Sequence, residues 1–246
     1  MRTRQGGLTN RTGEMRVSKL AAMVLLAPLA VSGQSVWDGE TDGHWGTAAN
    51  WVGDTLPPFG VGATIQFYAT GAGNLATFLG AARTIGTLEF NSNVTAPVSI
   101  RLATTSGGGT AAHLTFDVAS GNAAINIAAG ASADITLGVS NGNLGLNDPL
   151  VINHQGTGLL NINRTLGVSG NTAPITITGG GTVRLLNNVS SGGVTLQNGW
   201  IQVNHNASFG TGTLTIQAGR ISAASSVSRT TAVAWVLGGD ISLGHP

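Results

Sequence analysis

Short alternations of apolar and polar residues recur along this chain. The clearest cover residues 85–90, 114–118, 124–127, 134–137, 175–177, 194–196 and 214–216. Each puts apolar side chains on one face and Thr, Asn or Ser on the other, as a half-buried strand does. Turns rich in Gly and Asn separate these segments, and no long stretch after residue 33 has the apolar spacing of a helix. The pattern predicts an all-β fold built from short strands.

A five-residue unit also repeats: Gly, any residue, apolar, polar, apolar. It begins at Gly181, Gly199 and Gly212, with a weaker copy at Gly219. One such unit cannot bury its own apolar face, whereas stacked units can. The repeat therefore predicts a β-solenoid in which each coil pairs its backbone with the next, with Thr and Asn ladders outside.

Residues 179–221 resemble the autotransporter-associated β-strand repeat. The resemblance rests on GGGTVRL at 179–185, SGGVTL at 191–196, NGWIQV at 198–203 and GTGTLTI at 210–216. The chain departs from the family at Val189-Ser190, where an aromatic is usual, and at Trp200, where Thr is usual. The resemblance implies a right-handed parallel β-helix in an exported protein with a structural or adhesive role.

The N-terminal residues have the order of a secretory signal peptide. A basic start at 15–19 precedes an uncharged apolar run at 20–29 and the small residues at 31–33. The run is shorter than the ~20 residues that a membrane helix needs. We predict a signal peptide at 1–33, with Met15 as an alternative start and an uncleaved anchor as the alternative interpretation. The mature chain is expected to have no transmembrane segment.

Charge changes when this segment is removed. It carries five of the 11 basic residues and one of the 10 acidic ones, so 6 and 9 remain and the net charge moves from +1 to 6 − 9 = −3. The mature chain has no Lys, and its Arg residues are scattered. A nucleic-acid binder needs a basic patch to neutralise phosphates, so this class of partner is excluded. We expect a secreted or outer-surface protein of a Gram-negative-type bacterium that needs no cofactor.

Three segments follow the predicted signal peptide. We expect a β-rich cap or first coils at 34–92, a diverged β-solenoid at 93–178 and the recognisable repeats at 179–246. Residues 240–246 end within or just after a strand with no polar capping coil. We expect the repeats to be truncated there, and the alternative is that a partner completes the open end. No run of alternating barrel strands follows them, so a translocator would be separate or missing.

Tryptophan is concentrated near the start of the mature chain, at Trp37, Trp45 and Trp51. One hypothesis is that these rings cover the apolar end of the solenoid. The alternative is that they are exposed and stack on sugar rings of a polysaccharide or a cell-surface glycan. Polar neighbours that would hydrogen-bond such a sugar are Asp38, Asp42 and Asn50.

Catalytic signals are weak. Residues 138–142 fit Gly-x-Ser-x-Gly around Ser140, but that motif works at a strand-to-helix turn and no helix is predicted to follow. Asp117, Asp134 and Asp148 could meet on adjacent coils as a glycosidase pair, although solvated turn residues explain them better. We therefore predict no catalytic residues.

Metal signals are equally weak. The acidic loop at 38–43 has oxygen ligands at alternate positions but lacks the rest of a calcium loop. No His spacing resembles a metal site, and we expect all five at turns or on the surface: His44, His113, His154, His205 and His245.

Three functions remain in order of preference. The first is a non-enzymatic, exported structural or adhesive repeat protein. The second is a carbohydrate-binding module that uses the three Trp residues. The third is a polysaccharide-degrading β-helix enzyme, which the lack of Lys and of paired acids disfavours.

Overall fold

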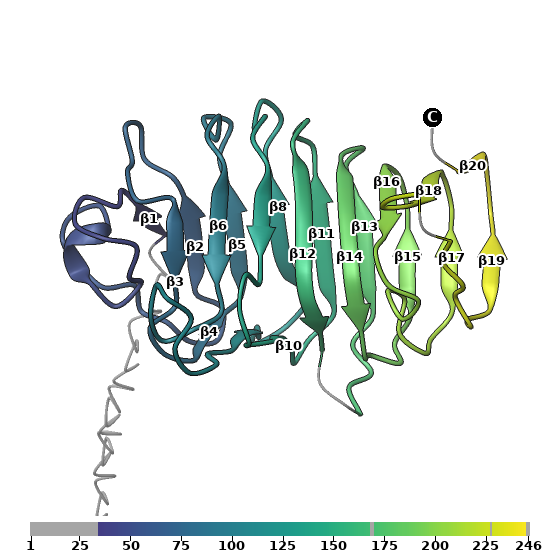
Figure 1. Ribbon diagram of the computed structural model, residues 1–246, viewed down its shortest axis with the longest axis horizontal. Helices are drawn as coiled ribbons and strands as arrows, with labels where there is room; N and C mark the ends of the chain where they lie inside the picture. The colour runs from purple at the N-terminus through teal and green to yellow at the C-terminus, as the bar shows by residue number, and fades with distance from the viewer. Residues whose placement is uncertain (1–33, 168–169, 227, 245–246) are drawn as a thin grey trace, which may run out of the picture. The chain divides into compact units, whose positions relative to one another are not determined.

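Strands dominate the residues that the computed structural model describes, which are 34–167, 170–226 and 228–244 (Figure 1). Within these ranges the only helix is the single 3-10 turn η1 (Ala48–Asn50). No helix of this part of the chain is long and apolar enough to cross a membrane. The prediction of an all-β fold is confirmed, whereas the predicted signal peptide at 1–33 lies outside the described residues.

Two parallel sheets contain the described strands. Sheet A pairs, in spatial order, β1 (Ser35–Trp37), β2 (Thr64–Phe67), β5 (Thr87–Phe90), β8 (Ala123–Ile127), β11 (Leu150–His154), β13 (Ile175–Thr178), β15 (Val194–Leu196), β17 (Leu214–Ile216) and β19 (Trp235–Leu237). Sheet B contains β3 (Ala76–Phe78), β4 (Arg83–Ile85), β6 (Val98–Arg101), β7 (Leu114–Phe116), β9 (Ile135–Leu137), β10 (Leu144–Leu146), β12 (Leu159–Leu166), β14 (Thr182–Asn188), β16 (Trp200–Val203), β18 (Gly219–Ala223) and β20 (Ile241–Leu243).

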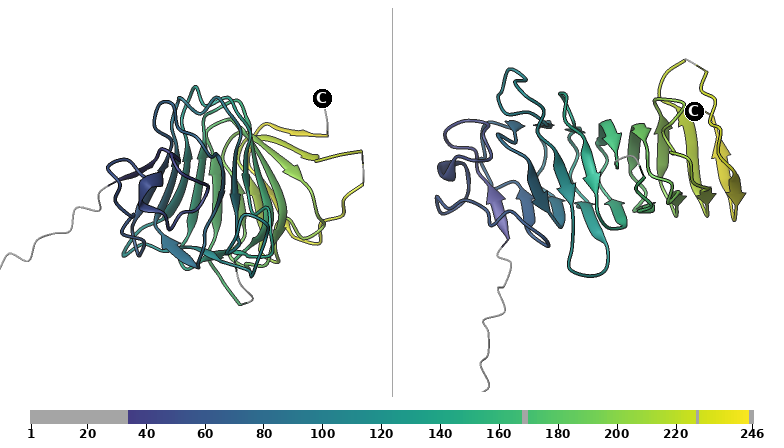
Figure 2. Two further views of the ribbon diagram at one scale, coloured as in Figure 1. Left: turned by 60° about the vertical axis from the view of Figure 1, so that its left-hand side comes forward. Right: turned by 90° about the horizontal axis from the view of Figure 1, so that it is seen from below.

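The chain passes from sheet A to sheet B and back in each turn, as the views in Figure 2 show. Each strand therefore pairs with the strands one turn earlier and one turn later, which is a β-helix-like arrangement. In the early turns sheet B has two rows, and β12 joins them because it pairs with both β9 and β10. From β14 onward each turn contributes one strand to sheet B.

Turn length becomes regular toward the C-terminal side. Register partners in sheet A are 196 − 177 = 19, 216 − 196 = 20 and 237 − 216 = 21 residues apart in the last three steps. Between Leu88 and Ile125 the step is 125 − 88 = 37 residues, because a long loop separates β6 from β7. Regular turns coincide with the region in which the sequence repeat can be recognised.

The core lies between the two sheets. Alternate residues of each strand point inward, and parallel register puts them in rows that cross the turns. One row of sheet A, in which every member is at most 1% exposed, consists of Ile65, Leu88, Ile125, Ile152, Ile177, Leu196 and Ile216. Burying one such side chain contributes about 1.5–3 kcal/mol, so these rows hold the turns together.

Polar side chains connect neighbouring turns on the outer faces. The Nε and a terminal guanidinium nitrogen of Arg184 both donate to Oε1 of Gln202, at 2.9 and 2.7 Å. Asn187 Nδ2 donates to Thr165 Oγ1 at 3.2 Å. These bonds link side chains 18 and 22 residues apart in sequence. The Asn187–Thr165 pair is of the kind predicted for the outer face, whereas the Arg184–Gln202 pair was not predicted.

Glycine opens the repeat unit because the turns approach closely there. Gly199 and Gly219 have φ of +100° and +112°, a region that L side chains rarely adopt. A Cβ on Gly199 would lie 2.7 Å from the carbonyl oxygen of Gly181, and one on Gly219 would lie 2.4 Å from that of Gly199. The recurrent glycines therefore stack from one turn to the next, where their backbones are in close contact.

The two ends of sheet A differ. At β1, a loop folds across the outer edge of the sheet. Val52 N donates to Val36 O at 2.9 Å, and Trp37 pairs with Trp51 in an isolated antiparallel β-bridge. Such cover prevents an edge strand from pairing elsewhere. At the other end, Val236 and Leu237 of β19 are 51% and 59% exposed.

Truncating one inward side chain tests the core. Ile152→Ala is expected to lower the free energy of unfolding by about 2–5 kcal/mol, because it leaves a cavity in a fully buried row. Val151→Ala removes methyl groups from the adjacent, outward-facing position and should cost about 1 kcal/mol or less. Urea denaturation followed by circular dichroism measures both. Equal losses in the two variants would contradict the inward assignment of Ile152.

Candidate functional site

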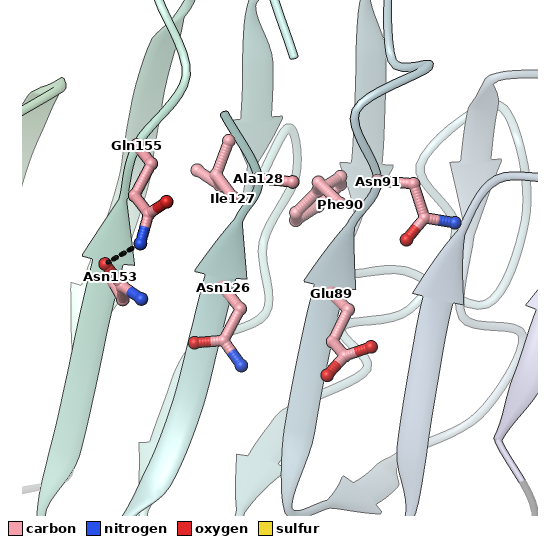
Figure 3. Close-up of a pocket in the computed structure, with 8 residues that line it drawn as sticks. All are labelled: Glu89, Phe90, Asn91, Asn126, Ile127, Ala128, Asn153 and Gln155. Atoms are coloured by element: carbon pink, nitrogen blue, oxygen red, sulfur yellow. Dashed lines mark hydrogen bonds between the residues drawn. The ribbon is translucent and has the colours of Figure 1, made fainter. Parts of the chain in front are cut away.

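A shallow hollow lies on the outer face of sheet A (Figure 3). Its volume is about 220 Å³, and it spans β5, β8 and β11 where these strands end. The lining residues are Glu89, Phe90, Asn91, Asn126, Ile127, Ala128, Asn153 and Gln155. Half of the lining residues are polar and uncharged, and Glu89 is the one lining residue that carries a formal charge.

Strand register places the polar groups of this hollow in one row. Glu89 pairs with Asn126, and Asn126 pairs with Asn153, so the three outward side chains occupy the same position on successive strands. Neighbouring strands are about 4.8 Å apart, so the row extends over about 10 Å. The sequence gives no hint of this, because the three residues are 37 and 27 positions apart (126 − 89 and 153 − 126).

Hydrogen bonds hold both ends of the row. At one end Gln34 Nε2 and Gln66 Nε2 donate to Glu89 Oε2, at 2.5 and 3.4 Å. At the other end Gln155 Nε2 donates to Asn153 Oδ1 at 3.4 Å. The amide of Asn126, between them, makes no hydrogen bond to any described residue.

The Trp residues do not form the exposed platform that a sugar site would need. Trp37, Trp45 and Trp51 are 0%, 0% and 1% exposed. Trp51 packs edge-on against Trp37 and Trp45, with ring centroids 5.1 and 5.9 Å away. Because the rings are enclosed, the hypothesis that they stack on a glycan is not supported by their packing.

The indole nitrogens of these residues are also engaged. They donate to Gly73 O at 3.2 Å from Trp37, to Thr77 Oγ1 at 3.0 Å from Trp45, and to Trp45 O at 3.1 Å from Trp51. All three indole nitrogens thus have protein acceptors. The cluster covers the β1 end of the core, which is the role that the first hypothesis gave it.

Trp200, on sheet B, lies in a more open hollow of about 410 Å³. Its Nε1 donates to Ser222 Oγ at 2.9 Å, and the guanidinium carbon of Arg220 lies 5.1 Å from its ring centroid. Both partners belong to the next turn, β18. Trp200 therefore contacts the next turn through both its indole nitrogen and its ring.

The catalytic candidates occupy structural positions. Ser140 is 6% exposed, so its hydroxyl is not presented as a nucleophile. Asp134 Oδ1 accepts from Leu159 N at 2.9 Å, Asp148 Oδ2 from Val118 N at 2.8 Å, and Asp117 Oδ2 from Asn147 Nδ2 at 2.6 Å. These carboxylates stabilise corners of the coils.

Hydrogen bonds to the side-chain amide of Asn50 hold the acidic loop at 38–43. Asn50, fully buried, accepts from Thr41 N and Asp42 N at 2.9 and 3.0 Å and donates to Asp42 Oδ1 at 2.6 Å. Burial raises the pKa of Asp42, but the hydrogen bonds from His44 N and Asn50 outweigh it, so the pKa is below its ordinary value. Within the described ranges, no three acidic, His or Cys side chains form a metal-binding group.

His154 corrects the expectation that every His lies at a turn or on the surface. It belongs to β11, is 1% exposed and occupies the inward row that contains Phe90 and Ile127. Its Nε2 donates to Gly158 O at 2.9 Å, whereas Nδ1 has no partner among the described residues. Desolvation by burial lowers its pKa, although the bond to Gly158 opposes this.

The glycines at 179–181 accommodate this buried ring. A Cβ on Gly181 would lie 2.4 Å from His154 Nδ1, and one on Gly179 would lie 2.5 Å from its carbonyl oxygen. Close contact with the preceding turn of the stack therefore requires glycine at 179 and 181. Of the other His residues, His44 stacks on Phe78 at 4.9 Å, and His113 and His205 are exposed. His245 lies outside the described residues.

These observations define the class as an all-β chain of stacked parallel turns. The chain matches no protein-family model, no curated protein and no solved structure. Interpretation of its function therefore depends on its own residues.

Removing a Trp ring tests whether the cluster is a structural cap. Trp45→Ala is expected to lower the free energy of unfolding by about 3–5 kcal/mol, because a large buried side chain is lost. Trp200→Ala, at a half-buried position, should cost clearly less. Thermal and urea denaturation measure both changes. A Trp45→Ala chain as stable as the parent would show that the ring is not part of the core.

Because His154 is buried, we expect the free energy of unfolding to depend on pH. Below about pH 6.5, the ordinary pKa of His, the imidazole takes up a proton in the unfolded chain, whereas burial disfavours the proton in the folded chain. The contribution of His154 to the free energy of unfolding is therefore fully present above that pH. It falls as pH decreases toward the lowered pKa of the folded state. His154→Gln should reduce the loss of stability between pH 7.5 and 5, whereas His205→Gln, at an exposed position, should not. Urea midpoints at each pH test this, and parallel profiles for all three chains would refute it.

Proposed function

We propose that this chain is an exported, non-enzymatic structural or adhesive protein whose stacked turns form a right-handed parallel β-helix at the cell surface or outside the cell. The observation that supports this most is the uninterrupted in-register pairing of successive turns from β1 to β19. A fold in which each turn contacts only its neighbours makes an extended scaffold. The resemblance of residues 179–221 to autotransporter-associated repeats is consistent with such a role.

The use of the polar side chains also favours a scaffold over an enzyme. Ser140 is enclosed, and the carboxylates of Asp134 and Asp148 accept hydrogen bonds from the backbone. A glycosidase needs two carboxyl groups held about 5–10 Å apart across a cleft. Carboxylates that fix coil corners instead stabilise the turns.

Export rests on the sequence pattern of residues 1–33. Produced in a Gram-negative host, the chain is expected to be cleaved before Gln34 and to leave the cytoplasm. Leu26→Arg puts a charge in the apolar run and should block processing, whereas Leu26→Ile should not. Mass spectrometry of the product, cell fractionation and protease treatment of intact cells give the readout. A full-length, cytoplasmic parent chain would overturn the proposal of export.

A further inference from the structure

The outer row of Glu89, Asn126 and Asn153 continues the register of Gln66, whose Nε2 donates to Glu89 Oε2 at 3.4 Å. Some outward side chains of adjacent turns bond to each other, as Arg184 does with Gln202. Others do not: no hydrogen bond joins the in-register Thr176, Thr195 and Thr215 among the described residues. Here three side chains on adjacent strands lie in register, yet no hydrogen bond joins any two of them among the described residues (Figure 3). Their hydrogen-bonding capacity is directed into a hollow of about 220 Å³.

The capacity that remains can be identified atom by atom. Asn126 keeps its carbonyl oxygen and both amide hydrogens, and Asn153 keeps its Nδ2 group, since its Oδ1 accepts from Gln155. Glu89 keeps Oε1, because Oε2 accepts from Gln34 and Gln66. Phe90 and Ile127 also border the hollow, but their side chains point into the core and are only 1% and 2% exposed.

We propose that this hollow binds one sugar unit of a neutral polysaccharide. A side-chain amide donates and accepts at neighbouring atoms, so it can bond two adjacent hydroxyl groups of a sugar ring. The volume is below the roughly 300–1,000 Å³ of sites that enclose a whole small molecule, which fits one unit of a longer chain lying across the sheet.

Other ligand classes fit less well. No Arg or Lys lines the hollow and Glu89 is negative, so phosphate groups and acidic sugars are disfavoured. Calcium takes six to eight oxygen ligands, and the row supplies a single carboxylate. A peptide strand would need a free sheet edge, but β5, β8 and β11 each pair on both sides.

This inference concerns the adhesive form of the proposed function and relies on it only for biological context. Binding by the purified chain tests the hollow wherever the protein resides, and export tests the location whatever the protein binds. Failure of either experiment therefore leaves the other interpretable.

The test uses the purified chain in affinity electrophoresis with four soluble polysaccharides: mixed-linkage β-glucan, xylan, galactomannan and polygalacturonate. At least one neutral polymer should retard the chain, and polygalacturonate should not. Asn126→Ala should weaken retention about tenfold, because it removes at least two hydrogen bonds that are each worth a factor of a few. Asn153→Ala should weaken it by a smaller factor.

Thr195→Ala is the matched control, since Thr195 faces outward on the same sheet at β15, outside the hollow. It should bind as the parent does, and circular dichroism should show that every variant is folded. Retention lost in Asn126→Ala but kept in Thr195→Ala supports the proposal. No retention by any neutral polymer, stronger retention by polygalacturonate, or equal retention of the parent and Asn126→Ala would each overturn it.

Discussion

In-register parallel pairing between successive turns is the constraint on which this structure depends. Because side chains alternate across a strand, a slip of one residue would turn the inward row to solvent. Ile152 pairs with Ile125 on one side and Ile177 on the other, and all three are buried. Backbone pairing and apolar burial therefore select the same register, which allows turns of 19 to 37 residues to share one stack.

Departures from the apolar inward row need local compensation. His154 occupies a position that its neighbours fill with Phe90 and Ile127. Its Nε2 proton is satisfied by the Gly158 carbonyl, and Gly181 leaves room beside the ring. A polar ring in the core is thus tolerated because one nitrogen has a partner and the next turn carries no side chain there.

The outer faces show two uses of polar residues. Pairs such as Arg184 with Gln202 connect neighbouring turns and add to the stability of the stack. The row through Asn126 keeps hydrogen-bonding groups toward solvent, at the hollow on the outer face of sheet A. The first use holds neighbouring turns together, and the second leaves polar groups unbonded on the outer face. The same backbone geometry produces both, because register alone decides which outward groups become neighbours.

The sequence by itself determined the local structure. Alternation of apolar and polar residues predicted strands that the structure contains, including β13, β15 and β17. These predictions succeeded because strand alternation is a property of a few adjacent residues. The repeat starting at Gly181 and Gly199 likewise predicted stacking. However, the copy at Gly212 lies in sheet A, whereas those at Gly181, Gly199 and Gly219 stack in sheet B.

Only the tertiary structure decided which residues became neighbours across turns. It enclosed Trp45, buried His154 and aligned Glu89, Asn126 and Asn153 in one row. Turn lengths vary from 19 to 37 residues, so no fixed sequence spacing marks such partners. The physical reason is that register is selected by the packing of the whole stack, and each contact between turns follows from that selection.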